Sequence, residues 1–125
     1  MAHRQMLVKV NGLIDVGIAE LVQILNEFPG IYSIESCQGS PRISAWVCFG
    51  YGNSFGERWQ PLARFVFGFL GPRLAREIGD RASLAIQVTG SGHFQAELTV
   101  RPGNMKTTIN ALQKLRKTFV NQLRP

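Results

Sequence analysis

The sequence contains few residues that could bind a metal ion or act as a nucleophilic thiol. The chain contains two cysteines and two histidines, and none of them stand at the CxxC or HxxxH spacings that zinc ligands usually show. We therefore expect no metal site. A Cys37–His93 pair has no evident third group to orient it, which makes nucleophilic catalysis an unfavoured interpretation. We name no catalytic residue, and the sequence favours a binding protein over an enzyme.

Long apolar runs are also missing. The longest, residues 65–71, is far shorter than the ~18 residues of a membrane span, and residues 1–12 lack the apolar stretch of a signal peptide. We expect a cytoplasmic protein without membrane contact, whose cysteines are reduced thiols. The length of 125 residues predicts a single domain, 1–125, that can fold without a disulfide or a metal.

Carboxylates are absent from the last fifth of the chain. The formal net charge is +6, and the excess falls in residues 101–125, which contain Lys and Arg but no Asp or Glu. Such a segment can contact phosphates, although a solvated helix face has the same composition. The side chains that we expect to contact RNA or another polyanion are Arg101, Lys106, Lys114 and Lys117.

The apolar periodicity predicts the order β-α-β-β-α-β-β-α. The strand patterns cover residues 6–10, 31–36, 43–49, 83–89 and 94–100. Asp15 is expected to cap the first helix, and Gly71-Pro72 to end the second. Short hairpin connections favour antiparallel pairing. The predicted fold class is α+β, a two-layer sandwich of a mostly antiparallel five-stranded sheet with helices on one face.

Strand alternation assigns this sheet an uncovered face. If Val47 and Phe49 point towards the helices, Trp46 and Cys48 point away from them. A tryptophan on a polar sheet face is a candidate for stacking a base or ring, or for a homodimer contact. It is equally a residue over which the loop at 50–57 could fold.

The stretch ESCQGSPR, residues 35–42, connects two of the predicted strands. Gly39 permits a positive φ, and Arg42 offers a fork for carboxylate or phosphate. Consecutive amides in such a turn can form an anion-binding concavity, but a plain hairpin turn has nearly the same composition. The ligand-binding residues that we expect in this loop and around the uncovered face are Ser36, Cys37, Gln38, Gly39, Arg42, Trp46 and His93.

Residues 16–49 resemble two groups of proteins. Ser36-Cys37-x-Gly39, followed by Arg42, is similar to the SCSGR-type motif of the tRNA wybutosine-synthesis methyltransferase family, in its third-enzyme branch. The helix-PGI-strand-SCxG-strand unit is similar to that of small phage and plasmid proteins of unassigned function. In the methyltransferases arginine follows the glycine directly, whereas two residues intervene here. That resemblance implies an α+β fold, S-adenosylmethionine as methyl donor and tRNA as substrate.

Together these patterns predict a small binding domain for a nucleic acid or another anionic ligand, without a cofactor. It would use the loop at 37–42 and the polar sheet face. Two alternatives stay open. One is a tRNA-base methyltransferase-like enzyme with S-adenosylmethionine as its cofactor, and the other is a phage-type homodimeric interaction protein.

Overall fold

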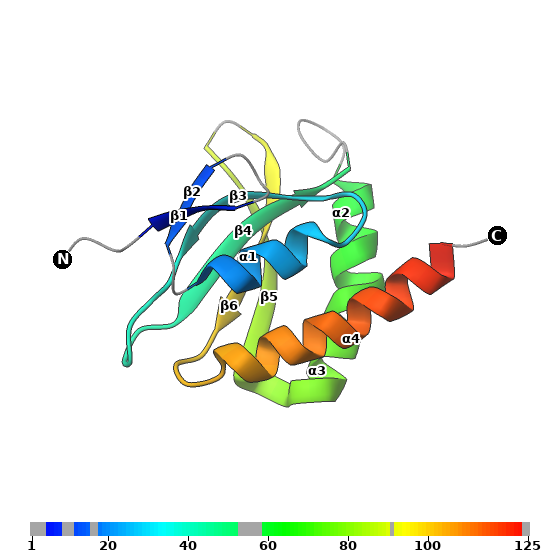
Figure 1. Cartoon of the computed structure of the whole chain (residues 1–125). Coiled ribbons are helices and arrows are strands. Elements are labelled where there is room, and N and C mark those ends of the chain that lie inside the picture. Colours follow the sequence, from blue (N-terminus) through cyan, green and yellow to red (C-terminus); the bar gives the residue numbers. More distant parts are fainter. Residues whose placement is uncertain (1–4, 9–11, 16–17, 53–58, 91, 124–125) are drawn as a thin grey trace.

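The computed structural model describes residues 5–8, 12–15, 18–52, 59–90 and 92–123. They form an α+β structure in two layers, in which helices cover one face of a sheet (Figure 1). The strands are β1 (Gln5–Val8), β2 (Gly12–Asp15), β3 (Ile31–Cys37), β4 (Ala45–Tyr51), β5 (Ala82–Val88) and β6 (Phe94–Val100). The helical segments are α1 (Ala19–Asn26), α2 (Gln60–Phe65), η2 (Val66–Leu70), α3 (Gly71–Ile78), η3 (Gly79–Arg81) and α4 (Met105–Leu123).

The main sheet has four strands, and our prediction of five was wrong. The strands lie in the order β3-β4-β6-β5, and each neighbouring pair is antiparallel. The strand expected to be the fifth, β1, pairs with β2 in a separate two-stranded sheet. The predicted alternation holds in the β5–β6 hairpin, where Leu84 pairs with Leu98 and Ile86 with Ala96.

The difference arises at residues 12–15. We expected Asp15 to cap the first helix, but it lies in β2 opposite Gln5 of β1. A local hairpin gives both strands their backbone partners while closing a shorter loop than pairing with a distant strand would. α1 then begins at Ala19 and has no side-chain hydrogen bond at its cap residue, Ile18.

α2, η2 and α3 form one continuous helical stretch, drawn in green in Figure 1. Our expectation that Gly71-Pro72 would end the helix was wrong. η2 is π-helical, and the amide of Gly71 donates to the carbonyl oxygen of Val66, five residues earlier. Pro72 follows in the first turn of α3. The wider turn before it relieves the clash that proline causes inside a regular α-helix.

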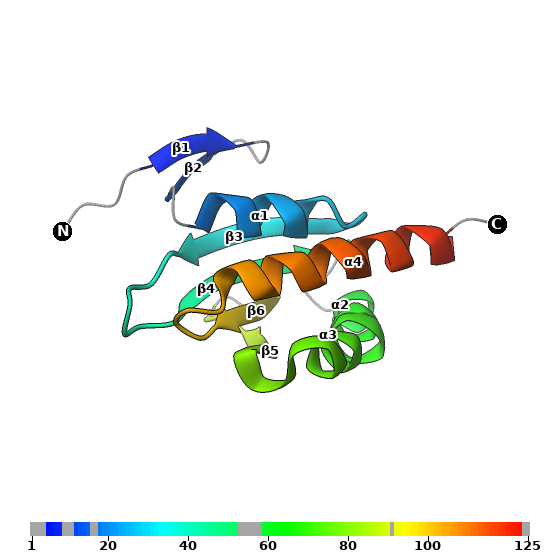
Figure 2. The same ribbon diagram turned by 60° about the horizontal axis from the view of Figure 1, so that its bottom comes forward.

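The helices bury one face of the main sheet. Val47 and Phe49 of β4 and Leu98 of β6 are fully buried within one apolar cluster. α4 lies across the helical layer and packs against both α1 and α3 (Figure 2). Phe65 of α2 meets Phe119 of α4 edge to face, with 5.2 Å between ring centroids. Within the described ranges, no helix combines the length and the apolar character needed to cross a membrane.

Candidate functional site

Ser40 closes the turn that joins β3 to β4. Its Oγ accepts hydrogen bonds from the amides of Arg42 at 3.2 Å and Ile43 at 3.1 Å, and its own amide donates to the carbonyl oxygen of Ile43 at 2.9 Å. These two amides were candidates to donate hydrogen bonds to a bound anion. They donate instead to the hydroxyl of Ser40 within the turn. The Arg42 side chain is exposed.

Gly39 is required by the backbone of this turn. Its φ is +69°, and a Cβ atom there would collide with the carbonyl oxygen of Ile43. Residues other than glycine rarely adopt this conformation. The presence of Gly39 is therefore explained by the hairpin, and the composition of the loop alone does not require a ligand.

The sheet face that points away from the helices, which we predicted to be uncovered, has two rows of register partners that cross the four strands. The first row, from β3 to β5, consists of Cys37, Trp46, Thr99 and Ser83. The second row consists of Glu35, Cys48, Glu97 and Ala85. Cys37 and Trp46 thus lie side by side, and Trp46 is half-buried. Ser36 pairs with Val47 and faces the helices, away from these rows.

This face is acidic. β3, β4, β5 and β6 contain no Lys or Arg, and their charged side chains are Glu35 and Glu97. Burial raises the pKa of the Cys48 thiol to about 11, and the charges of Glu97 and Glu35 add to the rise. Gln87 Nε2 donates to Glu97 Oε2 at 2.8 Å. A phosphate placed over these rows would meet two carboxylates, so the face disfavours a polyanion.

His93 and Cys37 lie towards opposite ends of the sheet. Cys37 is the partner of Trp46, Trp46 is the partner of Thr99, and His93 stands just before β6, six residues earlier than Thr99. At the rise of a β-strand, six residues place His93 about 20 Å along the strand direction from the row that contains Cys37 and Trp46. This distance is too great for the three side chains to share one pocket. The described part of the chain also contains no group of three or more His, Cys, Asp or Glu side chains that could hold a metal.

The basic side chains predicted near the C-terminus divide into two kinds. Arg101 forms an ion pair with Asp80 at 3.5 Å, and Lys114 forms one with Glu77 at 3.1 Å. Both pairs are largely exposed, so each contributes little to stability, but each lowers the positive charge that the surface offers. The other two, exposed on α4 and outside any ion pair with the described residues, are Lys106 and Lys117.

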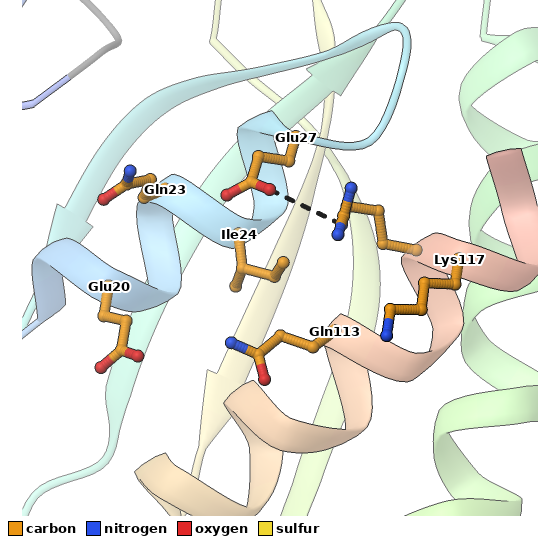
Figure 3. Close-up of a pocket in the computed structure, with 7 residues that line it drawn as sticks. Glu20, Gln23, Ile24, Glu27, Gln113 and Lys117 are labelled. Atoms are coloured by element: carbon orange, nitrogen blue, oxygen red, sulfur yellow. Dashed lines mark ion pairs between the residues drawn. The ribbon is translucent and has the colours of Figure 1, made fainter.

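A polar groove of about 430 Å³ separates α1 from α4 (Figure 3). Its lining consists of Glu20, Gln23, Ile24, Glu27, Gln113, Arg116 and Lys117. Glu27 is joined across the groove to the Nε of Arg116 at 3.6 Å. The lining contains equal numbers of acidic and basic side chains, so the groove has no strong preference for an anion or a cation.

The second hollow, which we call the arginine cleft, lies between α2–η2 and the end of α4 and has a volume of about 470 Å³. Its lining consists of Tyr51, Pro61, Arg64, Phe65, Gly68, Phe69, Arg73, Phe119 and Gln122. None of these lining residues is acidic. The arginine cleft therefore combines two cations with aromatic rings, in contrast to the uncovered sheet face.

Planar groups follow one another along the arginine cleft. The ring of Tyr51 stacks on Phe65 at 4.7 Å with an interplanar angle of 7°, and Phe65 stacks on Phe69 at 6.1 Å and 19°. The guanidinium carbon of Arg73 lies 4.3 Å from the centroid of the Phe69 ring. This cation–π contact holds a side chain that would otherwise be mobile.

Our sequence interpretation missed Arg64 and Arg73. The arginine cleft joins residues far apart in the chain, so no local pattern describes it. One signal was present, because residues 58–76 contain Arg58, Arg64, Arg73 and Arg76 around an aromatic run and no Asp or Glu. A basic, aromatic and carboxylate-free stretch is a known indicator of anion recognition.

Comparisons with family models, curated proteins and solved structures found no match for this chain. The resemblance of residues 16–49 to the wybutosine-synthesis methyltransferases, and to the small phage and plasmid proteins, therefore stays a prediction.

Proposed function

We propose that the protein is a binding domain for a polyanion, specifically a nucleic acid. The bound nucleic acid would lie along the helical layer. The observation that carries this proposal is the difference in charge between the two layers. The helical segments contain eight basic side chains: Arg64, Arg73, Arg76, Arg81, Lys106, Lys114, Arg116 and Lys117. They contain three acidic ones, Glu20, Glu77 and Asp80, and Glu27 follows directly after α1.

α4 is the segment best suited to a phosphate backbone. It has 19 residues and none of them is acidic. Lys106 and Lys117 lie on its exposed side, about 17 Å apart along the axis at the rise of an α-helix. Neutralising phosphates with lysine releases counterions, which supplies most sequence-independent affinity. The sheet layer, with Glu35 and Glu97, would repel the same ligand.

The test is fluorescence anisotropy with labelled single-stranded RNA, single-stranded DNA and duplex DNA. We expect binding at about 50 mM salt, with an affinity that falls by roughly 10- to 100-fold at about 200 mM. The reason is that the logarithm of the binding constant falls linearly with the logarithm of the salt concentration, with a slope set by the few phosphate contacts. The Lys106→Gln, Lys117→Gln double variant should bind more weakly. Glu35→Gln, on the opposite face, is the matched control and should bind no more weakly than the parent.

Two results would count against this function. If none of the three nucleic acids binds at low salt, the protein does not act on nucleic acids by this surface. If Arg42→Gln weakens binding while the lysine variants do not, the ligand contacts the β3–β4 turn instead of the helical layer.

A further inference from the structure

We propose that the arginine cleft is a separate binding site for a small organic anion that combines a planar unsaturated ring with a carboxylate or phosphate group. This inference does not rest on nucleic-acid binding, because the residues that carry it differ from Lys106 and Lys117. A volume of about 470 Å³ falls within the range of roughly 300–1,000 Å³ typical of small-molecule sites.

The charge in the arginine cleft calls for an anion. Neither Arg64 nor Arg73 forms an ion pair with a carboxylate of the described residues, and none of the described residues that line the cleft is acidic. Two cations that share one hollow repel each other, and a bound carboxylate or phosphate would relieve that repulsion. The groove between α1 and α4 lacks this feature because two carboxylates, Glu20 and Glu27, line it together with its two cations, and Glu27 is paired with Arg116.

Arg73 is already held in place for such a ligand. Its guanidinium lies over the Phe69 ring at 4.3 Å, and its Nη1 lies 3.4 Å from the carbonyl oxygen of Phe69 and 3.5 Å from that of Gly68. The contacts with the described residues use Nη1, so with respect to those residues the N–H groups of Nε and Nη2 remain for the paired hydrogen bonds that guanidinium makes with carboxylate or phosphate. Prior ordering of this kind lowers the entropic cost of binding.

The planar part of the ligand follows from the stack of rings. The rings of Tyr51, Phe65 and Phe69 stack in succession, and the guanidinium carbon of Arg73 lies over the last of them. A planar ligand group would continue this series by stacking on the guanidinium. Unsaturated rings stack favourably on arginine planes. Gln122, on the α4 side, adds an amide that can hydrogen-bond to a polar ring edge.

Calorimetry with matched probes tests the site. Adenosine 5′-monophosphate and 1-naphthoate each combine a ring with an anionic group, and they distinguish a phosphate ligand from a carboxylate one. Adenosine, which has the ring without the anionic group, and inorganic phosphate, which is the anion without the ring, are the control ligands. We expect at least one combined probe to bind with a Kd of about 1 mM or tighter, and to bind at least tenfold more tightly than either half.

The variants separate a specific site from general attraction to a basic protein. Arg73→Gln and Arg64→Gln should each weaken the combined probe by about tenfold, the cost of a charge-assisted hydrogen bond. Arg76→Gln, which removes an exposed charge from the same helix but does not line the cleft, should leave binding unchanged. Arg73→Lys keeps the charge and loses the plane, so it should weaken the ring-bearing probe more than inorganic phosphate. Thermal unfolding of each variant verifies that it folds.

The inference is overturned if neither combined probe binds, or if Arg64→Gln and Arg73→Gln bind as the parent does. It is also overturned if Arg76→Gln is as damaging as Arg73→Gln, because the effect is then net charge alone. None of these outcomes bears on the lysines of α4, whose variants are scored against nucleic acid in the separate experiment.

Discussion

The amide of Gly71 donates to the carbonyl oxygen of Val66, and a Cβ atom on Gly71 would stand 2.6 Å from that same oxygen. The π-helical bond and the missing side chain therefore depend on each other. π-helical turns are frequently found at functional sites. Here the turn ends three residues before Arg73 and supplies Gly68 and Phe69 to the wall of the arginine cleft.

We predict that Gly71→Ala destabilises the protein and Gly68→Ala does not. The alanine at 71 forces backbone apart in a packed helix, at a cost of about 1–3 kcal/mol in the free energy of unfolding. A Cβ atom at Gly68 meets nothing within 4 Å, so there the better helix propensity of alanine should stabilise by up to about 1 kcal/mol. Urea denaturation of both variants measures the difference, and equal effects would show that the π-helical bond does not constrain residue 71.

The two cysteines should differ in reactivity. Cys37 is partly exposed, whereas Cys48 is buried and its pKa is raised to about 11. Because the thiolate is the reactive form, iodoacetamide at pH 8 should label Cys37 first. The labelling of Cys48 in the folded protein should rise about tenfold per pH unit until about pH 11. Peptide mass analysis distinguishes the two sites, and equal labelling at pH 8 would contradict the burial of Cys48.

The raised pKa of Cys48 also makes the free energy of unfolding depend on pH. Above pH 9 the thiol of the unfolded chain loses its proton while the folded one keeps it, so this contribution to stability is present below pH 9 and is lost as the pH rises towards about 11.

Glu97→Gln should lower the pKa of Cys48 more than Glu35→Gln, because the charge of Glu97 is the larger cause after burial. The pH dependence of labelling in the two variants measures this order, and the reverse order would contradict it.

The basic side chains of α4 should differ in their effect on nucleic-acid binding. Lys117 forms no ion pair with the described residues, whereas Lys114 is paired with Glu77. Removing a lysine that contacts a phosphate reduces the salt slope by about 1. Lys117→Gln should therefore change the slope by about that amount and Lys114→Gln by less. Anisotropy titrations over a salt series measure both, and a larger effect of Lys114→Gln would show that its ion pair opens on binding.

The sequence was informative where the structure depends on near neighbours in the chain. The alternation of Leu84 and Ile86 with small or polar residues predicted the first strand of the β5–β6 hairpin, because one face of each strand packs against the apolar cluster. Alternation cannot say which strand is the partner, and for that reason β1 was placed in the wrong sheet. The basic, aromatic stretch at 58–76 could have indicated Arg64 and Arg73, but the shape of the arginine cleft could not be predicted, because tertiary packing alone brings Tyr51 and Phe119 beside η2.

Asn26 ties the end of α1 to the first residues of β3, and its loss should be costly. Its Nδ2 donates to the carbonyl oxygen of Val22 at 2.8 Å, and its Oδ1 accepts the amide of Ser33 at 3.0 Å. Asn26→Ala leaves both partners without this side chain in a partly buried place, which should lower the free energy of unfolding by about 1–3 kcal/mol. Asn26→Asp keeps the acceptor and loses the donor, so its cost should be intermediate. Asn110→Ala, at an exposed position of α4, is the control and should stay within about 0.5 kcal/mol of the parent. If Asn26→Ala is as mild as Asn110→Ala, water replaces both hydrogen bonds and the side chain is not what fixes α1 against β3.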